Sequence, residues 1–214
     1  MNNWKIAVHQ QPFRKYLILQ LAAIMLILAC MSHFFDVIET RQGMMFNDRV
    51  LNYLPAVNVS AFILVFIWSS VILAIVRASA DPNMFLTFLL AYILLCASRI
   101  VTISLLPLNA PGSLIALKDP LSNIAYNGRF ITKDLFYSGH TSTLFLIFLC
   151  LKKRYDRRYV LAASIITGVL LLVQHVHYTI DVVVAPVFAF GCFWCARKVL
   201  EKRKVYVVFN ELTD

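Results

Sequence analysis

Long runs of apolar residues, separated by short polar and charged connections, dominate the pattern of this chain. A helix that spans a membrane needs about 20 mostly apolar residues. Six stretches are predicted as spans: 16–35, 59–78, 84–106, 136–151, 159–176 and 179–197. The fourth is short for a full crossing, so we expect it to begin at the outer interface. The first has no small-residue cleavage site, which favours a retained span over a signal peptide.

The composition agrees with this pattern. Of the 214 residues, 60% are hydrophobic and 14% are charged, and the mean hydropathy is +0.74. Ordinary globular domains have about 45–50% apolar and about 25% charged residues, so a soluble core cannot absorb this excess. Disordered, collagen-like and disulfide-rich secreted chains are excluded too. We therefore predict an all-α, polytopic membrane protein, a bundle of six transmembrane helices that forms one domain over residues 1–214.

The basic residues predict how the chain is oriented in the membrane. Cytoplasmic connections carry an excess of Lys and Arg, and 14 of the 20 basic residues fall on one side of the predicted spans. They are Lys5, Arg14, Lys15, Arg77, Lys152, Lys153, Arg154, Arg157, Arg158, Arg197, Lys198, Lys202, Arg203 and Lys204. Both termini are thus predicted to be cytoplasmic, in a cell inner or plasma membrane. The loops 36–58 and 107–135 and the turn near residue 177 are predicted to be extracytoplasmic.

The basic run at residues 152–158 (K-K-R-Y-D-R-R) could by itself indicate a nucleic-acid partner. Because it lies between two predicted spans, we interpret it as a cytoplasmic anchor near anionic lipid instead, and we expect no nucleic acid as a partner. The five cysteines fall within spans, where a thiol packs as a small apolar group. Cys192 and Cys195 form a C-x-x-C without a second pair, so packing is favoured over a metal site.

Two polar clusters open predicted spans at the same outer face. Ser138-Gly139-His140-Thr141 opens the fourth span, and His177-Tyr178-Thr179-Ile180-Asp181 opens the sixth. Ionisable residues at membrane depth are functional candidates because burying them in the bilayer is costly.

The spacing within the clusters predicts their chemistry. His177 and Asp181 are four residues apart and share a helix face, so the carboxylate can orient the imidazole as a nucleophile. His140 can protonate a leaving oxygen. Ser138 is a candidate N-cap and Gly139 gives close access to the helix start, where free N–H groups can hold phosphate oxygens.

Two other interpretations compete with catalysis. A single histidine in a span more often packs or forms an interhelical hydrogen bond, and this is our interpretation of His33 and His175. A metal site made by His175 and His177 is disfavoured because residues two apart on a helix point in nearly opposite directions. In a transporter, the His and Asp cluster would form a relay, but helix-breaking residues are scarce within the spans.

The two clusters carry a family resemblance. S-G-H-T, followed about 35 residues later by H-Y-T-I-D-V-V-V-A, resembles the sphingomyelin synthase-like branch of the type 2 phosphatidic acid phosphatase (PAP2) superfamily. The resemblance is close over residues 134–185, which include D-L-F-Y before the S-G-H-T. A weaker similarity covers R-I-V-T-I-S-L-L-P at residues 99–107. The family resemblance as a whole implies a PAP2-like bundle of six helices, with a catalytic core at about 84–200 and an extracytoplasmic site.

The resemblance also implies a reaction. His177 would attack phosphorus and form a phosphohistidine, Asp181 would activate it, and His140 would protonate the departing alcohol and then deprotonate the incoming one. The substrates would be membrane lipids: a phospholipid donor, with a lipid alcohol as acceptor in a transferase or water in a lipid phosphate phosphatase. No metal or other cofactor is required. We favour transfer of a phospho-head group, with the phosphatase as the alternative.

The chain also departs from the superfamily's phosphatases. It has no R-P pair of the K-x6-R-P motif, and Leu170 and Leu171 stand where those enzymes have S-R. We interpret this as support for the synthase-like branch. Arg99 is the candidate replacement for the missing phosphate clamp, or else an arginine that snorkels to the membrane surface. Lys133, Arg129 and Tyr178 complete the candidate substrate-binding residues.

Overall fold

The computed structural model of the protein describes residues 3–117 and 131–209, so Lys118 and Arg129 lie outside the described residues. The described part is helical and contains no β-strand, apart from an isolated bridge between Met44 and Leu108. Its helices are α1 (Asn3–His9), α2 (Gln11–Thr40), α3 (Arg49–Tyr53), α4 (Ser60–Ala80), α5 (Pro82–Leu105), α7 (Gly139–Cys150), α8 (Arg154–Val173) and α9 (Thr179–Lys202).

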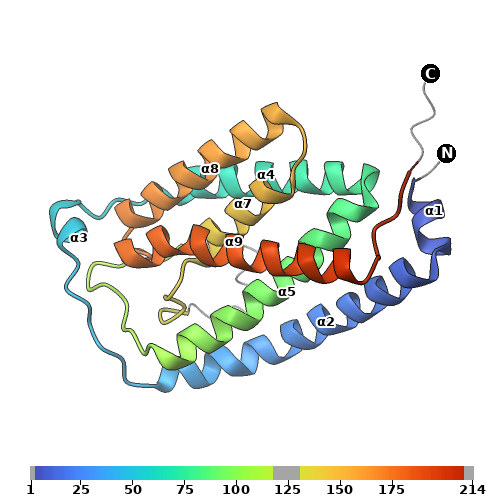
Figure 1. The fold of residues 1–214 in the computed structure, drawn as a ribbon. Helices are drawn as coiled ribbons and strands as arrows, with labels where there is room; N and C mark the ends of the chain where they lie inside the picture. The colour runs from blue at the N-terminus through green and yellow to red at the C-terminus, as the bar shows by residue number, and fades with distance from the viewer. Residues whose placement is uncertain (1–2, 118–130, 210–214) are drawn as a thin grey trace.

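The helices form a bundle around α7. This short helix contacts α4, α5, α8 and α9, while the long α2 lies along one side and packs against α5 (Figure 1). Helix α1 and the segment that follows α9 lie at the same end of the bundle, and α3 lies at the other end (Figure 1). We refer to these as the terminal end and the loop end. The first turn of α9 and the end of α8 lie at the loop end (Figure 1).

All six predicted stretches contain a helix, but the described helices long and apolar enough to cross a membrane are four: α2, α4, α5 and α9. These four indicate an integral membrane protein. At 1.5 Å per residue, the 12 residues of α7 reach about 18 Å, well short of the roughly 30 Å hydrocarbon core. Four of the first five residues of α8 are charged. The count of six spanning helices is therefore not confirmed and stays a prediction.

The surface of the bundle carries large apolar side chains, and its core contains small ones. Leu26 of α2, Ile75 of α4 and Val187 of α9 are 66%, 63% and 68% exposed, which suits helices that face lipid. Inside, Ala185 and Ala189 of α9 are fully buried in the main cluster. In a membrane the hydrophobic effect does not drive helices together, so they associate through close packing, which small residues allow.

The turn between α8 and α9 fastens the connections at the loop end. Gln174 is fully buried, and its amide donates to Ser60 Oγ at 2.8 Å and to the Ile115 carbonyl at 3.2 Å. His175 has a left-handed backbone (φ 57°), and its ring bonds the Leu54 carbonyl through Nε2 at 3.1 Å and Ser113 Oγ through Nδ1. His175 thus lies in a turn rather than in a span, and it bonds loop residues instead of forming the interhelical hydrogen bond that the sequence predicted. It holds the turn that precedes His177.

Candidate active site

The start of α9 is fixed by two carboxylates. Asp181 Oδ2 accepts a hydrogen bond from the Tyr178 N–H at 3.0 Å and so closes the first turn from within. Asp48 approaches from the loop before α3: its Oδ2 accepts from the Thr179 N–H at 2.6 Å, and its Oδ1 accepts from Thr179 Oγ1 at 3.0 Å. Acidic groups suit this position because the first N–H groups of a helix have no intrahelical partner.

His177 and Asp181 form a buried pair beside this turn, but they do not share a helix face as predicted, because α9 begins only at Thr179 and His177 lies in the turn before it. His177 Nδ1 lies 3.4 Å from Asp181 Oδ2, and the two side chains are 3% and 0% exposed. Neither His177 Nδ1 nor Asp181 Oδ1 has a hydrogen-bond partner among the described residues. Buried polar atoms without a partner are rare. Here they belong to an imidazole and a carboxylate that lie within ion-pair distance of each other, as an orienting pair requires.

The start of α7 lies directly against this pair. The Ser138 N–H donates to the Asp181 backbone carbonyl at 3.0 Å, so the S-G-H-T and H-Y-T-I-D motifs are joined by a hydrogen bond. Ser138 is fully buried and caps α7 by accepting from the Thr141 N–H at 3.4 Å. His140 follows in the first turn of α7 and is only partly buried. The structure therefore brings together the helix starts that carry His140, His177 and Asp181.

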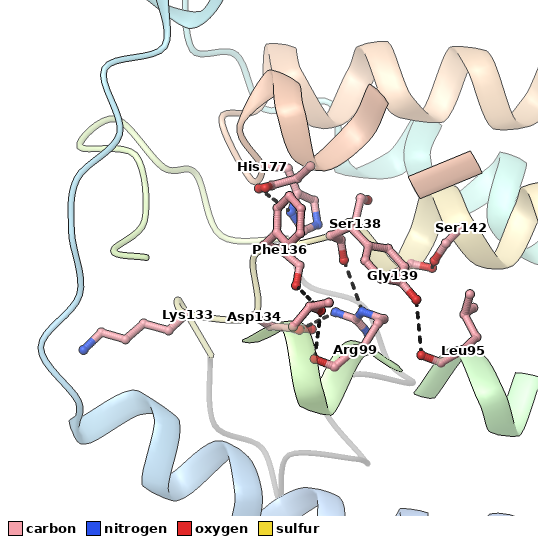
Figure 2. A network of polar contacts seen from close by, with 12 residues as sticks. Leu95, Arg99, Lys133, Asp134, Phe136, Ser138, Gly139, Ser142 and His177 are labelled. Carbon is pink, nitrogen blue, oxygen red and sulfur yellow. Dashed lines mark hydrogen bonds and ion pairs between the residues drawn. The ribbon is translucent and has the colours of Figure 1, made fainter. Parts of the chain in front are cut away.

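Arg99 enters the same region from α5. Its side chain is 9% exposed; Nε donates to the Tyr137 carbonyl at 3.2 Å and Nη2 pairs with Asp134 (Figure 2). The guanidinium lies against Gly139, where a Cβ would stand 2.6 Å from Nη1. A snorkelling arginine would extend to the membrane surface instead. Arg99 is thus a buried cation held at the start of α7, next to the segment that connects to Asp181.

Gly139→Ala is expected to displace Arg99 and to lower activity by about tenfold or more, because a shift of about 1 Å at a reacting site can reduce rates up to roughly 10²-fold. The guanidinium is the end of a flexible side chain, so the fold should persist. Gly191→Ala is the matched control, since a Cβ added there would meet no described atom within 4 Å. Steady-state kinetics on purified variants check this; equal activity of the two would separate Arg99 from the chemistry.

Lys133 and Tyr178 are engaged away from the His177–Asp181 pair. The Lys133 ammonium donates to the Glu39 carbonyl at 2.9 Å and to the Arg41 carbonyl, and Figure 2 shows its side chain pointing away from Arg99 and His177. Tyr178 is 2% exposed; its hydroxyl donates to the Asn109 carbonyl at 2.8 Å and accepts from the Phe46 N–H at 3.3 Å. Both fasten loops here, and their substrate-binding roles stay predictions.

The structure adds Asp48 and Asp134 to the residues that build the site. Asp48 also caps α3, accepting from the Val50 N–H at 3.0 Å, and an Asp before a short helical stretch is a sequence signal for such a cap. Its bond to Thr179 joins positions 131 residues apart, for which no local pattern exists. In the sequence, Asp134 stands out only as part of the D-L-F-Y resemblance, which does not predict its pairing with Arg99.

The ionised form of Asp48 is expected to stabilise the loop end. Burial raises the pKa of this carboxyl, but hydrogen bonds from Thr179, Leu51 and Val50 outweigh burial and bring the pKa below its ordinary value of 3.8. A carboxyl of lowered folded pKa stabilises the protein above its unfolded pKa, and this stabilisation disappears as the pH falls through the folded value. Asp48→Asn should therefore lower the free energy of unfolding by about 1–2 kcal/mol near neutral pH.

The measurement is thermal unfolding of wild type and Asp48→Asn in the same detergent across an acid series. The gap between the two melting temperatures should be constant above the ordinary pKa and should narrow as the pH falls below it. A gap that does not change with pH would mean that shape rather than charge makes Asp48 stabilising.

A cavity of about 520 Å³ adjoins the turn that carries His177. It lies at the loop end between the segment around Asp48 and the segment at 111–113, and Tyr178 and His175 line it from the turn. In the described part of the chain, no three His, Cys, Asp or Glu side chains gather as a metal site would require. Cys192 and Cys195 are free thiols.

The chain was compared with known proteins and protein families. No curated protein matches the chain. Residues 133–198 match the family described as PAP2 superfamily C-terminal. The matched segment runs from Lys133 through both motifs to near the end of α9, and thus contains His140, His177 and Asp181. Members of this superfamily are generally phosphatases or phosphotransferases, so the match supports a membrane-lipid-modifying enzyme of the PAP2 superfamily.

Proposed function

We propose that the chain is a sphingomyelin synthase-like lipid phosphotransferase, which moves a phospho-head group from one lipid to the hydroxyl of another through a phosphohistidine on His177. The observation that carries the proposal is the hydrogen bond from the Ser138 N–H to the Asp181 carbonyl. This hydrogen bond joins the start of α9, where His177 and Asp181 lie, to the start of α7, where His140 lies. The match of residues 133–198 to the PAP2 superfamily further supports phosphoryl-transfer chemistry.

The proposed reaction has two steps. With its proton on Nδ1 directed at Asp181, His177 attacks the donor phosphorus through Nε2; the N–P bond forms and the P–O bond to the lipid alcohol breaks. His140, as imidazolium, gives its proton to the departing oxygen. In the second step His140 takes the proton of the incoming hydroxyl, whose oxygen attacks phosphorus as the N–P bond breaks. Both histidines return to their starting states.

The negative charge that develops on the phosphoryl oxygens needs preorganised donors. The first-turn N–H groups of α7 are such donors, since a helix N-terminus favours anions. Arg99 adds a positive charge against Gly139 at this helix start. Asp134 holds the guanidinium in place, and its own charge is offset by Arg99.

Transfer is favoured over hydrolysis by the residues at the missing clamp positions. Leu171 stands in the position of the phosphatases' S-R motif and is fully buried in a cluster with Ile63 and Leu144, so this part of α8 has an apolar packing role. A site that lacks this clamp is typical of the synthase-like branch. In this chain, Arg99 would bind the phosphate in place of the missing clamp. A lipid phosphate phosphatase is the alternative, with water in place of the lipid alcohol.

Incubation of the purified protein with a head-group-labelled phospholipid tests the proposal. With diacylglycerol or ceramide added, a transferase forms a new labelled lipid, and the yield depends on the acceptor. Release of labelled head group or phosphate, independent of acceptor, would replace transfer with hydrolysis. No turnover with either acceptor across phosphocholine, phosphoethanolamine and phosphoglycerol donors would overturn the enzyme assignment for these lipids.

The site is proposed to face the extracytoplasmic side, because the basic residues gather at the terminal end. Cysteine accessibility tests this orientation. A variant whose five native cysteines are replaced by serine receives a single cysteine at Tyr155 or at Ile115. The two positions should react differently with an impermeant maleimide added to intact cells. Tyr155 is 83% exposed at the start of α8. The cysteine at 115 should be labelled and the cysteine at 155 protected until lysis, whereas the reverse pattern would invert the orientation.

A further inference from the structure

A second polar cavity lies at the terminal end of the bundle, far from His177. It has a volume of about 510 Å³ and is formed by the starts of α5 and α8, the ends of α7 and α9, and the segment after α9. Asp181 and Arg197, which lie near the two ends of α9, are 16 residues apart, which is about 24 Å along the helix axis. This cavity therefore cannot belong to the candidate active site.

The cavity is built into the fold by the segment that follows α9. Asn83 of α5 bonds Val207 twice, donating to its carbonyl at 2.7 Å and accepting from its N–H at 3.0 Å. Tyr206 Oη lies 2.9 Å from Thr87 Oγ1, and Val205 and Val207 are buried. These contacts fix one wall of the cavity in place.

Three cations line this cavity: Lys152, Arg157 and Arg197. Lys152 pairs with Asp81, and Arg197 Nη2 lies 2.8 Å from Glu201 Oε1. Arg157 has no carboxylate within ion-pair distance in the described chain. Its Nη1 donates to the Leu151 carbonyl at 3.1 Å, and its Cζ lies 4.6 Å from the centre of the Phe148 ring. The cavity thus holds a positioned guanidinium whose charge no carboxylate of the described residues neutralises.

We propose that this cavity binds a phosphate group, carried by an anionic membrane lipid or present as free phosphate. A guanidinium donates two parallel hydrogen bonds to phosphate oxygens, and a nearby ammonium adds a point charge. Arg157 supplies the first and Lys152 the second, and Arg197 is a third cation of the lining. Phe193 and Leu149 add apolar surface to the lining, which fits the acyl chains of a lipid.

Isothermal titration calorimetry in detergent tests the proposal with dihexanoyl phosphatidic acid and, separately, with inorganic phosphate. The His177→Ala background prevents turnover of the lipid. Arg157→Gln should weaken binding of the preferred probe by about tenfold, as expected for one lost charge-assisted hydrogen bond. Lys202→Gln, which removes an equal charge at the end of α9 outside the cavity, should leave binding unchanged.

The two probes identify the source of the phosphate. Tighter binding of the lipid supports a lipid site, and equal binding of both supports a site for free phosphate. Arg157→Lys keeps the positive charge but cannot donate two parallel hydrogen bonds, so it should give an intermediate affinity. If Arg157→Gln does not fold, Arg197→Gln tests another cation of the lining. If neither probe binds, or if Arg157→Gln and Lys202→Gln bind equally, the proposal is wrong.

Discussion

Replacing His177 with alanine is expected to abolish lipid turnover, with a loss of at least about 10³-fold. Removal of a nucleophile eliminates the covalent step itself, and such losses are large. The side chain is 3% exposed, and its Nδ1 has no hydrogen bond among the described residues. Its removal therefore breaks no hydrogen bond at Nδ1, and the protein should still fold. Steady-state kinetics with head-group-labelled lipid, together with a thermal unfolding curve, check both expectations.

His33→Ala is the matched control for this variant. His33 lies on α2 and is exposed, so its loss should leave turnover unchanged. The label adds a second measurement: wild-type protein mixed with donor alone should retain labelled head group on the polypeptide, and His177→Ala should not. Full activity of purified His177→Ala would remove the nucleophile from this position and with it the proposed reaction.

The candidate site could be predicted from sequence as far as local spacing and charge allow. The four-residue spacing correctly predicts that His177 and Asp181 lie close together, although the pair forms across the start of α9 and not on one helix face. The distribution of basic residues predicts one membrane depth for both motifs. The hydrogen bond from Ser138 to Asp181 agrees with that prediction of proximity. Hydrophobic runs likewise predicted where α2, α4, α5 and α9 lie, because long apolar helices have a strong sequence signal.

Partners that are far apart in the chain could not be predicted. Arg99 and Lys133 are both cations predicted near the outer face, and sequence spacing does not say what either side chain contacts. Only tertiary structure separates them: Asp134 and the Tyr137 carbonyl hold Arg99 against Gly139. The carbonyls at the end of α2 hold Lys133 instead. A cation is drawn to whichever carboxylate or carbonyl the fold brings near, and sequence spacing does not contain that information.

Burial also explains why spans were harder to count than helices. α7 is surrounded by α4, α5, α8 and α9, so it can be apolar without being long enough to cross a bilayer. The helix starts at Gly139 because Ser138 caps it, three residues later than the apolar pattern predicts. Hydropathy responds to a buried core helix and to a lipid-facing helix alike, and only length and surroundings separate the two.

Asp181→Asn is expected to lower kcat by roughly 10²–10⁴-fold while the KM and the melting temperature change little. An asparagine oxygen can still accept from the Tyr178 N–H, as Asp181 Oδ2 does at 3.0 Å, so the first turn of α9 is preserved. The same Oδ2 lies 3.4 Å from His177 Nδ1, but an amide oxygen in its place carries no negative charge to stabilise the imidazole as it becomes cationic. Loss of the carboxylate beside a catalytic histidine is known to cost about 10⁴-fold in kcat in a serine protease.

The split between kcat and KM separates this positioning role from a structural one. Asp181 is fully buried and is not expected to touch the lipid, so a loss confined to kcat means that it acts through His177. Asp156→Asn is the matched control. Asp156 lies at the start of α8 and pairs with Arg77, so its substitution should leave kcat unchanged. An Asp181→Asn enzyme with wild-type kcat would reduce Asp181 to a helix cap, and parallel losses of activity and melting temperature would do the same. A loss of kcat in a protein of unchanged stability requires instead that the carboxylate acts on the imidazole, from whose Nδ1 its Oδ2 is 3.4 Å away.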